Sequence, residues 1–181
     1  MTRLYSFALL FLCAACQTIP PGPVASGERF AYRLGTGDRV LITVFGETSL
    51  TGEFTLDGTG TIAYPLLGRI AAATKTTTEL GDEISTRLGA KYIRNPRVTV
   101  ALTSYRPIYI LGEVARSGEF PYTEGLNAFA LVAKAGGFTF RANRTAIFIR
   151  HENETEEKAY PLNGALVIRP GDTVRVGERY F

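Results

Sequence analysis

The feature that most constrains this fold is a repeated alternation of short apolar stretches with tight turns. Arg39–Phe45 (RVLITVF) follows a Gly-Thr-Gly-Asp turn, and Arg97–Leu102 (RVTVAL) follows the pair Asn-Pro. Alternating apolar residues predict strands, and Gly, Pro and Asp provide the backbone conformations of the turns between them. The nineteen glycines, eleven phenylalanines and nine tyrosines fit the same interpretation. We therefore expect many strands joined by short turns.

A hairpin is expected in the first half of the chain. Gly52–Leu56 and Thr61–Leu66 are two short apolar stretches, and they flank the sequence Asp-Gly-Thr-Gly at 57–60. Asp and Gly between two such stretches are typical of a hairpin turn. The sequence therefore predicts that these two strands pair with each other.

One helix is expected after the threonines at 76–78. A threonine hydroxyl can accept a hydrogen bond from a free backbone N–H of the first helical turn. Leu80, Ile84 and Leu88 then recur every four residues, so one face of the helix is apolar. We expect the helix to end near Gly89–Tyr92.

A second unit with strands and a short helix is expected after residue 103. Asn127 can cap a helix over Ala128–Ala135, and the glycine pair at 136–137 ends it. The expected strands are Pro107–Val114, Gly118–Tyr122, Thr145–Arg150, Lys158–Leu162 and Thr173–Val176. Both halves together predict the α+β fold class.

One pattern occurs twice. The stretches GTGDRVLI at 35–42 and RPGDTVRV at 169–176 share the order Gly-Asp-x-Val-x-hydrophobic. Two turn-to-strand entries with the same turn chemistry would explain this, and so would a duplicated domain. The lengths between the other elements do not repeat, which favours the first explanation.

The first residues are expected to be a signal. Arg3 precedes the uncharged, largely apolar stretch Leu4–Ala15, and Pro20 follows too closely for a membrane-spanning helix of about 20 residues. The chain's two cysteines, Cys13 and Cys16, lie at the end of this stretch. They lack the further ligands of a zinc site and the strand context of a redox pair.

This segment resembles a bacterial lipoprotein signal, in which a lipid-bearing cysteine becomes the first residue of the mature chain. The resemblance implies removal of residues 1–15, lipid attachment at Cys16 and a tether over residues 16–28. Cys13 departs from the leucine usual at its position, whereas Gln17 is typical of lipoproteins that move to the outer membrane. A plain secretory signal and an ordinary buried helix are the alternatives.

Composition and motifs argue against nucleic-acid binding and catalysis. The formal charge falls from +3 to +2 when Arg3 is removed, which is too small to predict a nucleic-acid partner. Asp38, Asp57 and Asp172 each lie beside glycine in a predicted turn, where a carboxylate bonds its own backbone. His151, the only histidine, lies in a polar loop and is expected to face water. We predict no enzymatic activity, no metal and no cofactor.

Seven stretches, in order, resemble the bacterial outer-membrane polysaccharide export family. The export domain, expected at 29–103, is represented by Tyr32–Glu47, Gly52–Ile70, Glu79–Leu88 and Asn95–Leu102. A soluble-ligand-binding β-grasp (SLBB) domain, expected at 104–181, is represented by Tyr109–Tyr122, Leu131–Arg144 and Ile168–Glu178. We expect a short form with one SLBB domain and without the amphipathic C-terminal helix of longer members.

The resemblance implies a ring of identical subunits on the periplasmic side of the outer membrane, held by acyl chains, through which a capsular polysaccharide or exopolysaccharide leaves. Its implied partner is an inner-membrane polysaccharide co-polymerase, often linked to a tyrosine kinase. Either a separate outer-membrane barrel protein supplies the opening, or the ring forms only the periplasmic part of the channel. The alternative is a monomeric periplasmic lipoprotein that binds a sugar or scaffolds an envelope complex.

Contact with the polymer is expected from aromatic, arginine and asparagine side chains. Aromatic faces stack on sugar rings, while arginine and asparagine form hydrogen bonds with hydroxyl groups. The candidates are Tyr105, Arg106, Phe140, Arg141, Asn143 and Arg144. The other interpretation is that the rings pack against the helix end and the arginines are solvated or lie at subunit contacts.

Overall fold

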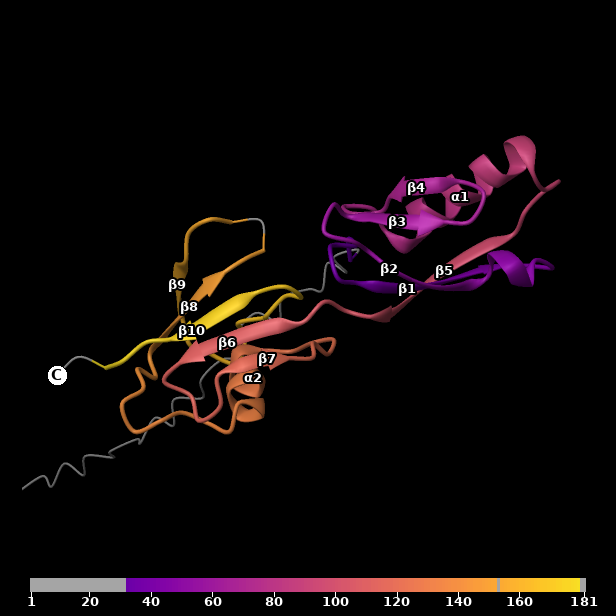
Figure 1. The fold of residues 1–181 in the computed structure, drawn as a ribbon. Helices are drawn as coiled ribbons and strands as arrows, with labels where there is room; N and C mark the ends of the chain where they lie inside the picture. Colours follow the sequence, from indigo (N-terminus) through magenta and orange to yellow (C-terminus); the bar gives the residue numbers. More distant parts are fainter. Residues whose placement is uncertain (1–31, 153, 180–181) are drawn as a thin grey trace, which may run out of the picture. The chain divides into compact units, whose positions relative to one another are not determined.

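The computed structural model describes residues 32–152 and 154–179, which all lie within one compact unit, Ala31–Phe181. These residues form ten β-strands, two α-helices and one 3-10 helix (Figure 1), so the predicted α+β class is confirmed. The predicted signal, Cys16 and the tether lie outside the described residues. The predicted domain boundary between residues 103 and 104 stays a prediction.

The first sheet has three strands in the order β2-β1-β5. They are β1 (Arg39–Val44), β2 (Gly52–Thr55) and β5 (Val98–Ser104). Both neighbours pair with β1 in the antiparallel direction, and the 3-10 helix at 48–50 connects β1 to β2. Alternate residues of β1 are buried, as its alternating sequence predicts, and they belong to the same apolar cluster as Leu80, Ile84 and Leu88.

The predicted pairing of Gly52–Leu56 with Thr61–Leu66 is wrong. β2 pairs with β1, whereas β3 (Thr61–Tyr64) pairs with β4 (Gly68–Ala71) in a separate two-stranded sheet. The sequence signals described above do not predict β4. Which strands pair is decided by packing against the rest of the molecule, and a local turn signal does not contain that information.

The turn at 57–60 nevertheless forms with the chemistry that its residues predict. The Asp57 carboxylate accepts hydrogen bonds from the backbone N–H and the hydroxyl of Thr59, at 2.9 and 2.6 Å. It also accepts from the backbone N–H and the hydroxyl of Thr61, at 3.0 and 2.8 Å. These bonds lower the pKa of Asp57, because they stabilise its charged form.

The helix α1 (Thr77–Lys91) confirms the predicted cap and apolar face. The Thr76 hydroxyl accepts from the Glu79 backbone N–H at 3.1 Å, and the Glu79 carboxylate accepts from the Thr76 backbone N–H at 2.8 Å. This reciprocal pair of bonds is a capping box. The leucines and isoleucine of the predicted face are fully buried.

The second sheet has five strands in the order β7-β6-β10-β8-β9. They are β6 (Ile108–Gly112), β7 (Gly118–Phe120), β8 (Ala146–Arg150), β9 (Lys158–Pro161) and β10 (Thr173–Val176). The last strand, β10, lies between β6, to which it is parallel, and β8, to which it is antiparallel. The helix α2 (Ala128–Lys134) begins at the predicted cap, Asn127, whose side chain accepts from the Ala130 backbone N–H.

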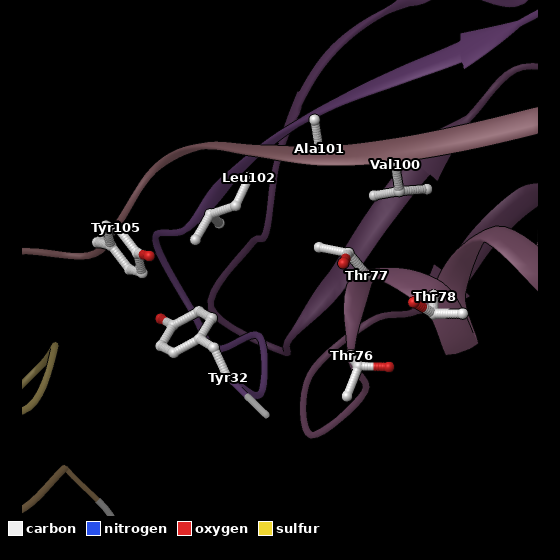
Figure 2. Close-up of a pocket in the computed structure, with 8 residues that line it drawn as sticks. All are labelled: Tyr32, Thr76, Thr77, Thr78, Val100, Ala101, Leu102 and Tyr105. Atoms are coloured by element: carbon white, nitrogen blue, oxygen red, sulfur yellow. The ribbon is translucent and has the colours of Figure 1, made fainter. Parts of the chain in front are cut away.

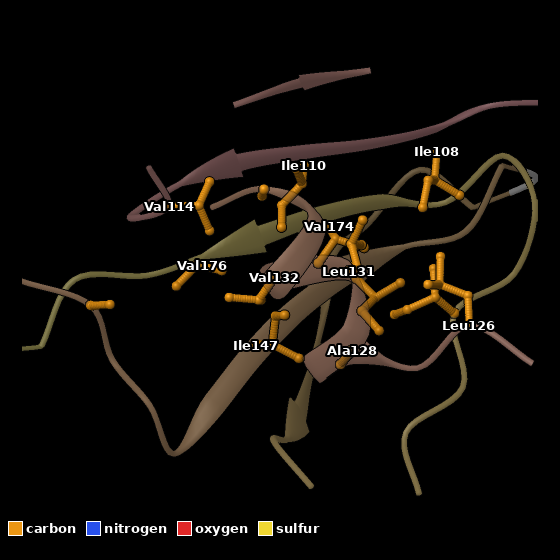
Figure 3. Close-up of a cluster of buried hydrophobic side chains, with 14 residues drawn as sticks. Ile108, Ile110, Val114, Leu126, Ala128, Leu131, Val132, Ile147, Val174 and Val176 are labelled. Atoms are coloured by element: carbon orange, nitrogen blue, oxygen red, sulfur yellow. The ribbon is translucent and has the colours of Figure 1, made fainter. Parts of the chain in front are cut away.

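Two separate clusters of buried side chains stabilise these elements. One is formed by residues between Leu34 and Leu88, and the other by residues between Ile108 and Val176. Figure 3 shows the second cluster, in which side chains of α2 pack against those of β6, β8 and β10. The sheets and helices of each half therefore bury their own apolar faces.

The repeated Gly-Asp pattern forms the same turn twice. Gly37 and Gly171 have φ values of 86° and 83°, a backbone conformation that favours glycine. Asp38 and Asp172 are almost fully buried, and each accepts a hydrogen bond from the backbone N–H three residues earlier, at 2.7 and 2.8 Å. The strands that follow have different pairings, β1 being antiparallel to both neighbours and β10 parallel to one. Shared turn chemistry therefore explains why the Gly-Asp pattern occurs twice.

Candidate functional site

Three of the six predicted contact residues line one groove just before β8. This cavity has a volume of about 560 Å³, and the residues that line it are Phe140, Ala142, Asn143, Arg144, Thr145 and Arg179. A fourth predicted residue, Arg141, lies between two of them in the sequence and pairs with Glu178 at 2.8 Å. We call this cavity the arginine groove.

Backbone hydrogen bonds fix the two segments that form the groove. The Asn143 N–H donates to the Gly177 carbonyl at 2.8 Å, and the Arg179 N–H donates to the Arg141 carbonyl at 2.8 Å. A bridge between Ala142 and Glu178 completes this short antiparallel pairing. The segment just before β8 is therefore tied to the segment after β10, although their middle residues, Ala142 and Glu178, lie 36 positions apart in the sequence.

Asn143 uses its side-chain oxygen to shape the loop. This oxygen accepts hydrogen bonds from the backbone N–H and the hydroxyl of Thr145, at 2.8 and 2.7 Å. Asparagine forms such turns readily, because its side chain reaches the backbone two residues ahead. The Asn143 side-chain oxygen is therefore engaged within the loop that lines the groove.

The aromatic residues of this loop have different roles. Phe138 is half-buried and packs against the second apolar cluster, as the packing interpretation expected. Phe140 is 81% exposed, and it lines the groove. The Arg144 guanidinium lies 5.7 Å from the centre of the Phe138 ring, a cation–π distance. The loop thus combines one anchoring ring with one exposed ring.

Tyr105 lies at a second cavity, of about 380 Å³, near the start of α1. The residues that line it are Tyr32, Thr76, Thr77, Thr78, Val100, Ala101, Leu102 and Tyr105 (Figure 2). Of the described residues that line it, none is charged. We call this cavity the tyrosine–threonine pocket.

Edge-to-face contacts position Tyr105, one of the residues that line this pocket. Its ring centre lies 5.0 Å from that of Tyr32 and 5.0 Å from that of Tyr122. Its hydroxyl donates to the Glu124 carboxylate at 3.1 Å. Burial and this carboxylate raise the pKa of Tyr105 to about 12, so the hydroxyl stays protonated near neutral pH. The pocket therefore presents rings and hydroxyl groups.

Arg106 is engaged within the protein, and it lies in neither cavity. Its backbone N–H donates to the Asp38 carboxylate at 2.7 Å, and its guanidinium lies 3.1 Å from the same carboxylate. The guanidinium also donates to the Pro170 carbonyl and pairs with Glu152 at 2.8 Å. Its side chain is only 14% exposed. Residues 38 and 106 lie 68 positions apart, so no sequence spacing could have indicated this pair.

Tyr32 completes the surroundings of the Asp38 carboxylate. The Tyr32 hydroxyl donates to both carboxylate oxygens, at 2.9 and 2.7 Å, and it accepts from the Arg106 guanidinium at 2.9 Å. Burial, the larger cause, and the hydrogen bond to Asp38 raise the pKa of Tyr32 well above its ordinary value. This buried carboxylate therefore has both a cation and a neutral donor.

The prediction that His151 faces water is wrong. The His151 Nδ1 atom lies 2.7 Å from the Asp172 carboxylate, and the histidine side chain is only 20% exposed. Burial raises the pKa of Asp172. A His–Asp pair can orient an imidazole for catalysis, but it then needs a nucleophile and a substrate cleft. Neither cavity described above includes His151.

Two further observations concern metals and membranes. Within residues 32–152 and 154–179, no group of three or more His, Cys, Asp or Glu side chains is close enough to hold a metal ion. In the same part of the chain, no helix is both long enough and apolar enough to cross a membrane.

Comparison with protein families gives two matches, one in each half of the chain. Residues 26–103 match the family described as "Polysaccharide biosynthesis/export protein". Residues 107–160 match the SLBB domain. The export-family match therefore covers the first half of the fold, and the SLBB match lies in the second half.

Three relatives are similar to large parts of the chain. Exopolysaccharide production protein ExoF of Rhizobium meliloti is 31% identical over 142 residues, which cover 70% of this chain and 34% of that protein. EPS I polysaccharide export outer membrane protein EpsA of Ralstonia nicotianae is 28% identical, over 92% of this chain and 52% of that protein. Polysialic acid transport protein KpsD of Escherichia coli is 25% identical, over 82% of this chain and 28% of that protein. The chain spans about a quarter to a half of the length of these relatives.

Proposed function

This chain belongs to the polysaccharide biosynthesis/export family, and we propose that it acts in the export of an exopolysaccharide or capsular polysaccharide from a bacterial cell. The observation that carries the proposal is the succession of an export-family match and an SLBB match along the chain. The names of the three relatives, which concern polysaccharide production, export and transport, support it. We propose no catalytic step in this function.

The finer proposal concerns location and assembly. The protein is a lipoprotein attached through Cys16 to the outer membrane, it faces the periplasm, and identical copies form a ring that encloses the path of the polymer. Rings form when one face of a subunit binds a different face of the next and the rotation closes. An inner-membrane co-polymerase, often with a tyrosine kinase, supplies the polymer and the driving energy. A separate outer-membrane barrel protein provides the final opening.

The two cavities suit passage of a sugar polymer. The tyrosine–threonine pocket offers rings and hydroxyl groups, and the arginine groove offers the exposed Phe140 ring and arginines. Weak contacts repeated around a ring guide a long chain without stopping it, whereas one tight site would retain it. Tyr105, Phe140, Arg141, Asn143 and Arg144 are the residues that we propose for these contacts, while the buried contacts of Arg106 give it a different role.

Deletion of the gene tests the proposed function. We expect the deletion strain to lose surface polysaccharide, measured as sugar released from washed cells, and a wild-type copy to restore it. A Cys16→Ser copy is expected to produce protein that leaves the membrane fraction, since its lipid attachment site is absent. Surface polysaccharide that is unchanged in the deletion strain would contradict a role in export.

The chain offers a matched control for the anchor. Cys13 lies three residues before Cys16 in the same segment. A Cys13→Ser copy should therefore stay in the membrane fraction and restore the surface polysaccharide. Release of both variants, or retention of both, would show that lipid attachment is not specific to Cys16.

A second candidate function is a monomeric, sugar-binding lipoprotein of the periplasm. The volumes of the two cavities favour it, because sites of about 300–1,000 Å³ commonly hold small ligands. The mass of the protein extracted in mild detergent separates the two candidates. We expect a closed assembly of many copies, and a stable monomer at every concentration would favour the sugar-binding lipoprotein.

A further inference from the structure

The two cavities differ sharply in charge. The tyrosine–threonine pocket is lined by uncharged residues only, among those described. The arginine groove is lined by two arginines, Arg144 and Arg179, and none of the described residues that line it is acidic. The first cavity thus offers hydroxyl groups and rings to a neutral sugar. The second adds the positive charge of the exposed Arg144.

Arg144 is the central cation of the groove. Arg144 is exposed, and in the described part of the chain no ion pair joins its guanidinium to a carboxylate. The Phe138 ring beneath it restricts the guanidinium without neutralising its charge. A planar guanidinium that is held in this way can bind a carboxylate or a phosphate through two parallel hydrogen bonds.

Arg141, which lies in the chain between the groove-lining residues Phe140 and Ala142, adds a second cation. Its only described carboxylate partner is Glu178, and both side chains are about half exposed, at 56% and 46%. Ion pairs between exposed side chains are weak, because water and salt screen them. An anionic ligand in the groove can therefore compete with Glu178 for this guanidinium.

The groove also has a ring and a fixed shape. Phe140, the most exposed of the large apolar side chains in the described part of the chain, lines the groove together with the arginines. The pairing of residues 141–143 with residues 177–179 and the Asn143 turn hold the loop in place. A site that is already ordered loses less conformational entropy when it binds.

We propose that the arginine groove binds the anionic groups of the exported polymer, so that the substrate class of this protein is an acidic polysaccharide. This inference rests on the proposed export function. Arg144 and Arg141 bind the negative groups, and Phe140 stacks on a sugar ring next to them. Each contact is weak, as passage of a polymer requires, and the contacts of the two arginines depend on salt.

Calorimetric titration of the full chain in detergent tests the inference. The probes are oligogalacturonate, which carries one carboxylate per sugar, uncharged maltohexaose, and inorganic phosphate. We expect oligogalacturonate to bind more tightly than both other probes. Its binding should weaken when the salt concentration rises from about 0.05 to about 0.5 M, because added ions screen exposed charges.

Variants of single arginines locate the binding. We expect Arg144→Gln to weaken oligogalacturonate binding about 3-fold, and the double variant with Arg141→Gln about 10-fold, as losses of exposed ion pairs. Arg144→Lys should retain part of the affinity, since the charge remains but the planar fork is lost. Arg94→Gln removes an exposed arginine outside the groove and should have no effect.

Three results would overturn the inference: equal binding of maltohexaose, equal binding of inorganic phosphate, or equal losses in the Arg94 and Arg144 variants. Circular dichroism spectra confirm that each variant is folded. The gene-deletion experiment is independent of polymer charge. Export can therefore stand when the charge preference fails, and the groove can bind acidic sugars when export fails.

Discussion

Replacing Gly112 by alanine should destabilise the protein by about 4 kcal/mol, which is at the extreme end for single substitutions. Gly112 is the last residue of β6 and has a φ of 89°, which side chains rarely tolerate. A Cβ atom there would lie 2.1 Å from the Val176 carbonyl oxygen. That oxygen accepts the Glu113 N–H in the pairing of β6 with β10, so it cannot move without breaking the sheet.

The position of β10 makes this clash costly. β10 is flanked by β6 and β8, and it contributes Val174 and Val176 to the second apolar cluster. Separating β6 from β10 would therefore expose buried side chains on both strands. Urea denaturation, followed by circular dichroism, measures the loss.

Gly125→Ala is the matched control. Gly125 also has a positive φ, of 75°, but nothing lies within 4 Å of the Cβ atom that alanine would add. The free energy of unfolding of this variant should fall by only about 1–2 kcal/mol, which is the conformational cost of a side chain on a left-handed backbone. Equal losses in the two variants would refute the clash with Val176 as the cause.

Replacing Arg106 by methionine should destabilise the protein by about 3 kcal/mol, because it leaves the buried Asp38 carboxylate without its cation. Methionine retains an unbranched side chain as far as the position of the arginine Nε atom, so the loss comes chiefly from the guanidinium and its contacts. The guanidinium contacts with Pro170 and Glu152 are removed as well. The free energy of unfolding in urea is the quantity to compare.

Two glycines leave room for this guanidinium. A Cβ atom on Gly35 would lie 2.1 Å from Arg106 Nη1, and one on Gly171 would lie 2.8 Å from Arg106 Nε. Both glycines belong to the repeated turns. The turns therefore leave space for the Arg106 guanidinium and also lead into the strands that follow them. Because both glycines lie close to the guanidinium, we expect that a shift of Arg106 would cost free energy.

Arg33→Met is the control for Arg106→Met. Arg33 pairs with Glu79 at 3.4 Å, but the two side chains are 60% and 51% exposed, so we expect a loss below about 1 kcal/mol. The double variant Arg106→Met with Asp38→Asn should lose less than the sum of the two single variants, since the pair is coupled. Additive losses would show that the Asp38–Arg106 pair contributes little.

Local signals were sufficient for most elements. The predicted helix after residue 76 is α1, its cap is Thr76, and its buried face carries Leu80, Ile84 and Leu88. The cap Asn127 is also confirmed. Caps, turns and apolar periodicity depend on residues within a few positions of each other, so the sequence contains the information that they need.

Long-range contacts account for the errors. The hairpin predicted around residues 57–60 has the predicted turn, yet its strands belong to different sheets. His151 has a polar local sequence, yet it pairs with Asp172, 21 residues later. Packing between distant parts of the chain determines the partners of these residues, and neighbouring positions in the sequence do not specify it.

The candidate site shows the same division. The loop with Phe140 and Arg144 was identified from its residue types, but Arg179 was not, because it joins the groove only through the pairing with residues 141–143. Arg106 looked similar to Arg144 in sequence, and only the fold distinguishes a buried, paired guanidinium from one that lines a groove.

The amino-acid order alone specified the α+β class, the two helices with their caps, most strands, and the family resemblance of both halves. Those features arise from hydrogen bonds and apolar spacing between near neighbours. The tertiary structure alone placed β10 between β6 and β8, paired Asp38 with Arg106 and assembled the arginine groove. Burial and charge pairing between distant residues decide these features, because their free energy depends on which surfaces meet when the chain folds.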